Sequence, residues 1–341
     1  MNSQENFRNK IDDYEQTIHA IVGFMNFYRY DDSTHKMKTN VLVFQGRRLE
    51  PSPERATSSN SEKIRHVTPD LGVLSEIKSG VLGEVKKSFP KDQELWMKTF
   101  EQLMSYDDDL RGWPSADGKV NSHDIVLLVH QTRAAPVLKF YQNKADADIT
   151  FRRPFIIIQF NRADEGKPYY FFQKTLGSLT EESVNGRLGD GVSVPMEIFV
   201  KTYSTIKIYD SQPPIPYLIE LIWTNVVLHS ASEDPKFQKL RKNQKIDVVL
   251  EIDRIIEELC QGFSFRSLHG GDSERQPKIP KREWVIMACE QLVKAKEATW
   301  EDSSQTRVRF LFKKYDDVLG HFIELCSELK TDEQLELPLK T

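Results

Sequence analysis

Pro69-Asp70-Leu-Gly-Val-Leu-Ser-Glu-Ile-Lys-Ser-Gly-Val-Leu-Gly-Glu84-Val-Lys86 is the stretch that decides the fold of this chain. Residues 66–74 form a short β-prone run, with Asp70 near its start. Residues 75–80 are polar and end in a glycine, which suits a hairpin turn, and residues 81–87 form a second β-prone run. The pattern therefore predicts two antiparallel strands joined by a tight turn.

This hairpin would gather three chemically useful side chains. Side chains alternate between the faces of a strand, so Glu84 and Lys86 point the same way, and the hairpin brings Asp70 beside them. Two neighbouring carboxylates suit Mg²⁺ or Mn²⁺, which prefer oxygen ligands and keep several waters. Such an ion polarises a scissile phosphate and lowers the pKa of a bound water. We expect Lys86 to orient the attacking water or to offset charge on the phosphate.

A helix is predicted to follow the hairpin, from about residue 92 to residue 110. Its apolar residues recur at helical spacing. Gln102 and Tyr106 are four residues apart, so they would share one face of this helix. We expect that face to dock over the hairpin and to contact the phosphate or the metal-bound water.

Asp70, then Glu84-Val85-Lys86, then Gln102-x-x-x-Tyr106 is an order of residues that resembles the PD-(D/E)xK nuclease superfamily, especially its RecB-like branch. The resemblance implies an α/β fold, a restriction-endonuclease-like mixed sheet flanked by helices. It implies that Asp70 and Glu84 ligate the metal, that Lys86 serves the nucleophile, and that Gln102 and Tyr106 form an accessory motif.

The activity implied by the resemblance is a Mg²⁺-dependent (or Mn²⁺-dependent) phosphodiesterase, with DNA favoured as the substrate. The resemblance also implies a role in restriction or phage defence. The chain would act together with a partner protein that delivers the substrate, or as a homodimer. The nearest basic residues for contacts with the nucleic-acid backbone are Lys87, Arg111 and Arg133. The alternatives are a catalytically inactive nuclease fold that serves as a binding or scaffold subunit, and a metal-free regulatory or toxin-neutralising subunit.

Two choices of residue stay open at this point. Glu76-Ile77-Lys78 also has the acid-x-lysine form, but it follows Asp70 too closely for a strand to end, turn and pair back. Glu84 and Lys86 are therefore preferred. A further acidic ligand is common in the family, and Glu15 and Glu62 are both candidates for it.

Composition fits an ordinary soluble protein. Hydrophobic residues make up 39% of the 341 residues and charged residues 29%, and the net charge of −4 confines any nucleic-acid surface to a local basic patch. The cysteines Cys260, Cys289 and Cys326 are far apart, so we expect buried free thiols and no zinc site. No signal peptide and no membrane span is recognised, and residues 215–228 are interpreted as a core helix, which indicates a cytoplasmic protein.

Residues 1–175 are predicted to form the catalytic domain. A helix over residues 7–30 would precede the hairpin, and buried strands are expected at 40–44, 124–130, 155–160 and 169–173. His130 ends one of these strands, where it would assist phosphate binding or act as a hydrogen-bonded edge residue.

Residues 176–265 are expected to be a β-then-helical extension of that core. The glycine-rich segment 185–191 would be a surface loop, a lid or a phosphate cradle, and lacks the Walker pattern. Strands are expected at 197–203 and 205–209, and helices at 217–230 and 246–260. Residues 264–281 have the composition of a linker.

Residues 266–330 are predicted to form an α-rich accessory unit, helical or winged-helix-like, with helices at 282–296 and 314–329. It would bind DNA or pack against a partner or second copy. The tail, 331–341, is expected to be flexible. The basic residues available for phosphate contacts are Lys281, Arg282, Arg307, Arg309, Lys313 and Lys314.

Overall fold

The computed structural model describes residues 3–31, 36–37, 41–52, 66–75, 78–87, 93–115, 117–144, 149–163, 169–195, 209, 211–239, 241, 244–260 and 280–335. Contacts divide the chain into two compact units. The sheet unit comprises Gln16–Ser204 and Phe265–Pro277, and the C-terminal unit comprises Met1–Glu15, Thr205–Ser264 and Lys278–Thr341. Residues 205–264, which belong to the predicted extension of the core, are grouped with the last part of the chain.

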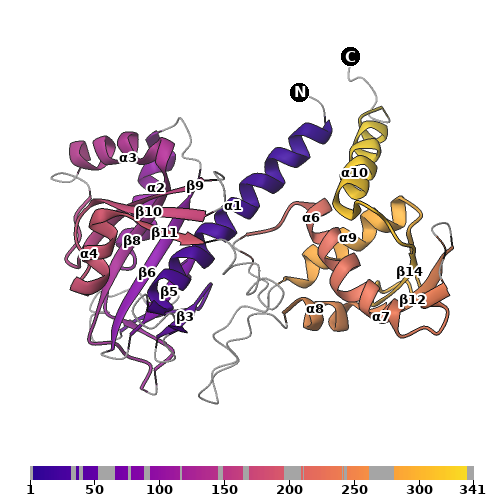
Figure 1. Cartoon of the computed structure of the whole chain (residues 1–341), viewed down its shortest axis with the longest axis horizontal. Helices are drawn as coiled ribbons and strands as arrows, with labels where there is room; N and C mark the ends of the chain where they lie inside the picture. Colours follow the sequence, from indigo (N-terminus) through magenta and orange to yellow (C-terminus); the bar gives the residue numbers. More distant parts are fainter. Residues whose placement is uncertain are drawn as a thin grey trace, which may run out of the picture. The chain divides into compact units, whose positions relative to one another are not determined.

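A seven-stranded mixed sheet forms the centre of the sheet unit (Figure 1). Its strand order is β11-β10-β9-β8-β6-β5-β3. The central strands β6, β8 and β9 are parallel, and the outer pairs are antiparallel. The bounds are β3 (Leu42–Phe44), β5 (Leu71–Leu74), β6 (Ser79–Lys86), β8 (Ser122–His130), β9 (Phe155–Ala163), β10 (Tyr169–Leu176) and β11 (Val192–Pro195). The unit is α/β, as the sequence predicts.

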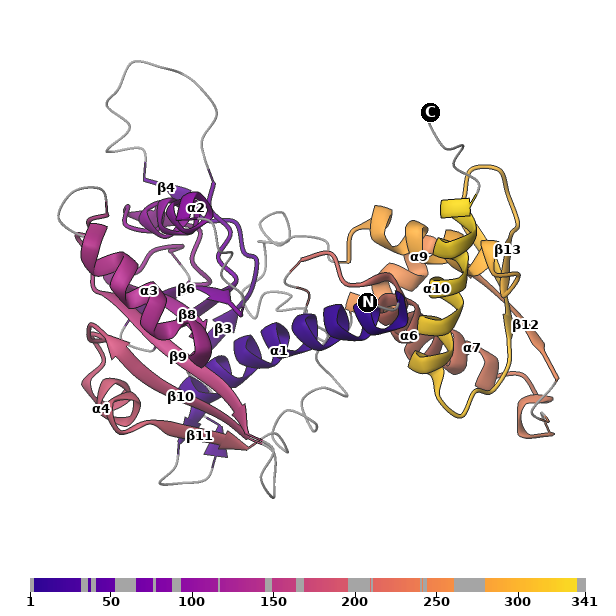
Figure 2. The ribbon, with the colours of Figure 1, turned by 90° about the horizontal axis from the view of Figure 1, so that it is seen from above.

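Helices cover both faces of this sheet, as Figure 2 shows. The helices α2 (Gln93–Met104) and α3 (Gln131–Lys144) lie on one face, where Phe100, Phe140 and Ile157 belong to one buried cluster. On the other face, α1 (Ser3–Arg29) packs Phe24 against Phe172 of β10. The helix α4 (Glu182–Asp190) lies on this second face, where Arg187 stacks over Phe27 of α1. Two short pairs complete the unit, β1 (Tyr30–Asp31) with β2 (Lys36–Met37) and β4 (Glu50–Pro51) with β7 (Leu110–Arg111).

The C-terminal unit contains a three-stranded antiparallel sheet of order β12-β14-β13. Helices precede, interrupt and follow this sheet along the chain. In order, the elements are α6 (Ile215–Leu221), the π-helix η2 (Ile222–Val227), α7 (Leu228–Ser232), the 3₁₀ turn η3 (Phe237–Lys239), β12 (Ile246–Glu251), α8 (Ile252–Cys260), α9 (Arg282–Lys294), β13 (Ala298–Trp300), β14 (Arg307–Phe312) and α10 (Val318–Leu335).

The structure corrects the predicted end of the helix after the hairpin. The helix α2 ends at Met104 and not at residue 110, so Tyr106 lies in the turn that follows it. The next residues are Asp107, Asp108 and Asp109. Carboxylates are unfavourable at the negative end of a helix dipole, and Asp107 instead binds backbone N–H groups elsewhere in the chain.

Two other local predictions were wrong. Residues 246–251 form a strand and not the start of a helix, because Ile246, Val248 and Leu250 alternate with exposed or half-buried residues and pair with β14. The glycine-rich segment 185–191 is neither a loop nor a phosphate cradle. Through Asp190 it belongs to α4, which buries Val184 and Leu188.

Several predictions concern residues outside the described part of the chain. These include the strand at 197–203, all of the strand at 205–209 except Tyr209, and nearly all of the linker at 264–281. The helix α10 continues to Leu335, and residues 336–341 of the predicted tail are not described. Cys289 and Cys326 are buried free thiols, as expected. None of the described helices is long and apolar enough to cross a membrane.

Candidate active site

The hairpin of β5 and β6 brings Asp70 beside Glu84. Leu71 lies opposite Gly83, and Asp70 and Glu84 are the next residues beyond this pair on the two sides of the hairpin. The carboxylate oxygen Oδ2 of Asp70 accepts a hydrogen bond from the backbone N–H of Val85, at 2.9 Å. This bond fixes the first acidic side chain against the strand that carries the second one.

Glu84 is fully buried, and both of its carboxylate oxygens have a partner. The ammonium group of Lys86 donates to Oε2 at 3.0 Å, and the hydroxyl of Tyr106 donates to Oε1. Lys86 also lies 3.8 Å from Oδ2 of Asp70, so one ammonium group serves two carboxylates. The side chains of Lys86 and Asp70 are 30% and 15% exposed, so solvent or a substrate reaches the site through them and not through Glu84.

The electrostatics of the pair follow from burial. Loss of water raises the pKa of Glu84 well above its ordinary value, and the neighbouring charge of Asp70 raises it further. Lys86 and the hydrogen bond from Tyr106 oppose this rise without cancelling it. Burial, followed by the charge of Glu84, likewise raises the pKa of the Tyr106 hydroxyl, which therefore keeps its proton and donates. A cation beside the two carboxylates would relieve their repulsion.

Gln102 connects this buried pair to the surface. Its side chain is exposed, and its amide nitrogen lies 3.3 Å from the hydroxyl of Tyr106 as a hydrogen-bond donor. Asp70, Glu84, Lys86, Gln102 and Tyr106 are therefore joined in one hydrogen-bonded group, as the sequence predicts. Gln102 is the member that is best placed to touch a bound molecule directly.

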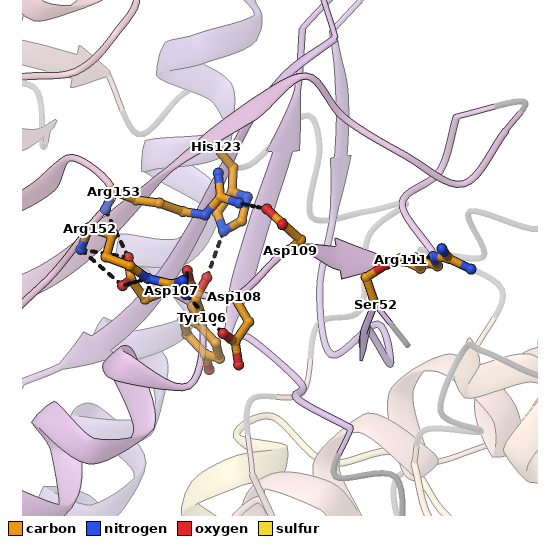
Figure 3. Close-up of polar contacts among 9 residues, drawn as sticks. All are labelled: Ser52, Tyr106, Asp107, Asp108, Asp109, Arg111, His123, Arg152 and Arg153. Carbon is orange, nitrogen blue, oxygen red and sulfur yellow. Dashed lines mark hydrogen bonds and ion pairs between the residues drawn. The ribbon is translucent and has the colours of Figure 1, made fainter. Parts of the chain in front are cut away.

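A second network, which the sequence analysis missed, holds the backbone at Tyr106 (Figure 3). The buried imidazole of His123 lies with Nε2 2.7 Å from the carbonyl oxygen of Tyr106, so Nε2 carries the proton and donates. Burial, followed by the charge of Arg153, lowers the pKa of His123 to about 4, which keeps the ring neutral at physiological pH. The carboxylate of Asp107 accepts backbone hydrogen bonds from Arg152 at 2.9 Å and from Arg153 at 2.8 Å.

The side chains of Arg152 and Arg153 complete this network. Arg152 donates to the Asp107 carboxylate at 3.0 Å, to its carbonyl at 2.7 Å and to Asp108 at 2.9 Å, while Arg153 pairs with Asp109. The network ties the turn after α2 to the segment before β9. It thereby fixes the position of the Tyr106 hydroxyl relative to the Glu84 carboxylate. The only sequence signal for it is the run of three aspartates and the pair of arginines.

Replacing Tyr106 with phenylalanine tests this support. The substitution keeps the ring and removes the hydroxyl that donates to Oε1 of the buried Glu84 carboxylate, so we expect the free energy of unfolding to fall by about 1–3 kcal/mol. Urea unfolding at neutral pH measures the change. Tyr28→Phe is a matched control, because Tyr28 is also buried in the sheet unit and its hydroxyl has no hydrogen-bond partner among the described residues. An equal loss in both variants would show that the bond to Glu84 is not the cause.

The competing acid-x-lysine triplet lies in the turn between β5 and β6. Glu76 and Ile77 are outside the described residues, whereas Lys78 has a φ of 55° and pairs at 2.7 Å with Asp117. Lys78 thus points to another carboxylate and not to Asp70. Of the two candidates for a further acidic ligand, Glu62 lies outside the described residues, and Glu15 is grouped with the C-terminal unit.

The other residues considered from the sequence contribute little to this group. His130 bonds through Nδ1 to the hydroxyl of Thr132 at 2.9 Å and packs against Phe160, as an edge residue does. Arg111 donates to the hydroxyl of Ser52 at 3.1 Å. Arg133 is exposed on the first turn of α3, and Lys87 is half-buried just after β6.

The donor set fits a hard divalent cation. Among the described residues there is no cluster of three or more His, Cys, Asp or Glu side chains that would hold a metal. Mg²⁺, however, is commonly held by one or two carboxylates, with waters and substrate phosphate completing its shell. Asp70 and Glu84 are the residues that would hold such an ion.

Comparisons of this chain with protein-family models, with curated proteins and with solved structures gave no match.

Proposed function

We propose that the sheet unit is a metal-dependent nuclease of the PD-(D/E)xK type that hydrolyses phosphodiester bonds in nucleic acid, with DNA favoured. The observation that carries the proposal is the convergence of Asp70, Glu84 and Lys86 with the Gln102–Tyr106 pair, in the order that the resemblance implies.

The order of elements supports the same conclusion. A long helix, α1, precedes the hairpin of β5 and β6, the helix α2 follows it, and β8 then pairs in parallel with β6. A helix ahead of the active-site strands and a central strand after the next helix are what the resemblance implies for this nuclease core. The acidic and basic side chains lie near the carboxyl end of β6, and ligands bind at that edge in many α/β sheets.

Each residue of the site would have its own role in binding or catalysis. When bound, Mg²⁺ would polarise the phosphate and lower the pKa of a water. The ammonium group of Lys86, held by two carboxylates and partly exposed, would position the attacking water and offset charge on the phosphate oxygens. Tyr106 holds Glu84 in one orientation, and the exposed amide of Gln102 would donate to a phosphate oxygen.

One observation favours a second candidate, a nuclease-derived fold that binds without cleaving. Both oxygens of Glu84 already have protein partners, and its raised pKa favours the neutral form. A protonated Glu84 would be a poor metal ligand, and the site would then act only as a polar anchor in a binding or scaffold subunit. The two candidates differ in whether Mg²⁺ binds. In the active case, a role in restriction or phage defence is the setting that we propose.

Incubation of the full chain with plasmid, single-stranded DNA and RNA tests the proposal directly. We expect cleavage of DNA with Mg²⁺ or Mn²⁺ and none with EDTA. Cleavage of RNA alone would keep the nuclease and change its substrate. Absence of cleavage on every substrate with both metals, together with retained binding of labelled DNA, would overturn the catalytic proposal in favour of the binding subunit.

A further inference from the structure

A row of side chains crosses the sheet from Lys86. Lys86 on β6 lies opposite Val129 on β8, Val129 lies opposite Gln159 on β9, and Gln159 lies opposite Gln173 on β10. Directly opposite residues of neighbouring strands project from the same face of a sheet. Gln159 and Gln173 therefore share the face of Lys86. Neighbouring strands are ~4.8 Å apart, which places the backbone of Gln159 roughly 10 Å from that of Lys86.

The polarity of this face changes at that row. One row deeper, Glu84 is in register with Leu127 and Ile157, which are completely buried under α2 and α3. In the row of Lys86, the glutamines are only half-buried. Val129, in the middle of this row, still belongs to the buried apolar core, whereas Lys86 on one side of it and the two glutamines on the other reach the surface.

The two glutamines hold each other in place. The amide nitrogen of Gln159 donates to the amide oxygen of Gln173 at 2.8 Å. This bond uses one of the two N–H donors of Gln159 and one acceptor site of Gln173, so the pair keeps further N–H donors for a ligand. Asn161 lies two residues after Gln159 on β9 and is also half-buried on this face. It places a third amide side chain near the glutamine pair.

Neutral amides of this kind suit the strand of a nucleic acid. Asparagine and glutamine side chains donate to phosphate and sugar oxygens and also bind base edges. A nucleic-acid strand with one phosphate at Lys86 would continue past the reaction centre in one of two directions. The glutamine pair lies on the side of Lys86 that is away from Asp70, in the same row and across the buried Val129.

We propose that Gln159 and Gln173 form a subsite that binds the strand of the nucleic acid next to the phosphate held at Lys86. The proposal rests on the nuclease function proposed above and adds to it the residues that hold the substrate outside the reaction centre. The subsite binds through hydrogen bonds and not through charge. Its contribution to binding should therefore depend less on salt than that of the lysines and arginines.

The test replaces both glutamines with leucine, a somewhat shorter apolar side chain that removes the amide. In the double variant we expect the KM for a single-stranded oligonucleotide to rise about tenfold, with little change in kcat, because two modest hydrogen bonds are lost. Anisotropy of a labelled oligonucleotide in EDTA should show a similar loss of affinity. Gln305→Ala is the control, since this half-buried amide bonds to Glu290 in the C-terminal unit and lies outside the proposed site.

A small substrate separates a subsite from general damage to the fold. Bis(p-nitrophenyl) phosphate has no strand that reaches the glutamines, so the double variant should hydrolyse it as fast as the wild type does. If the double variant fails to fold, the single variant Gln173→Leu on β10 takes its place, with an expected rise in KM of roughly threefold.

The outcomes distinguish the two proposals. Wild-type cleavage with an unchanged KM and affinity in the glutamine variants would overturn the subsite and leave the nuclease intact. An equal loss on the oligonucleotide and on the small phosphodiester would also overturn the subsite. A wild-type chain that neither cleaves nor binds any nucleic acid would overturn the proposed function and the subsite with it.

Discussion

We expect the substitution Lys86→Ala to lower the proposed metal-dependent cleavage by about 10²–10³-fold, which is the usual effect of removing one preorganised charge from the transition state. The reason is the position of its ammonium group, which lies 3.0 Å from Glu84 and 3.8 Å from Asp70 on a side chain that is 30% exposed. Initial rates on plasmid DNA with saturating Mg²⁺ measure the loss. Circular dichroism and thermal unfolding confirm that the variant is folded.

Lys78→Ala is the matched control for this substitution. Lys78 belongs to the competing acid-x-lysine triplet, and its ammonium group pairs with Asp117 on the exposed side of the turn. An exposed pair of this kind contributes little to stability, so we expect full activity in the variant. Loss of activity in Lys78→Ala and its retention in Lys86→Ala would show that the other triplet holds the catalytic lysine.

The hairpin and its site were predictable because their signals are local. Asp70, Glu84 and Lys86 lie on two strands joined by a short turn, and the alternation of side chains alone decides which of them share a face. The same argument places Gln102 beside the hairpin, through a helix that follows directly. The predicted end of that helix was wrong by several residues. Tyr106 nevertheless lies beside the hairpin, because the turn after the helix holds it there.

The parts that the sequence did not predict depend on contacts between distant residues. His123 is seventeen residues from Tyr106, and Asp107 is 45 residues from Arg152, so no local pattern indicates that they meet. Similarly, residues 246–251 alternate over too few positions to be distinguished from a helix until β14 pairs with them. Pairing across the chain, and not intrinsic preference, decides these elements.

The position of Gln159 and Gln173 beside the site could not be predicted from the sequence for the same reason. Gln159 and Gln173 occur in two strands that are predicted from their apolar residues, and neither glutamine belongs to a motif. Only the register of four strands, β6, β8, β9 and β10, places them in the row of Lys86. The structure is therefore needed to find the proposed subsite, whereas the residues of the proposed reaction centre are suggested by the sequence.

Replacing Glu84 with glutamine is expected to abolish both cleavage and stabilisation by Mg²⁺. The carboxylate is one of the two groups that would hold the ion, so the rate should fall by at least about 10²-fold. Without metal, burial and the charge of Asp70 raise the pKa of Glu84 above its ordinary value of 4.5. Between the ordinary and the raised pKa, the native state binds more protons than the unfolded state, so the stability of the wild type falls as the pH rises.

The direction of this pH dependence can be tested without an activity assay. In EDTA, urea unfolding should show that the wild type loses stability as the pH rises above the ordinary carboxyl pKa of 4.5 and that Glu84→Gln loses less of it. Mg²⁺ should restore the wild type at the higher pH values, because the ion favours the ionised carboxylates and binds only the native state, and it should not stabilise the variant. Glu101→Gln, at an exposed position of α2, should behave as the wild type does.

Equal pH slopes in the wild type and in Glu84→Gln would show that Glu84 ionises in the fold as freely as in the unfolded chain. Equal stabilisation of both by Mg²⁺ would place the ion elsewhere. If the wild type shows the slope but gains nothing from Mg²⁺ or Mn²⁺, the buried carboxylate is a neutral hydrogen-bonding group. The chain would then be a binding subunit that keeps the arrangement of a nuclease site without its metal.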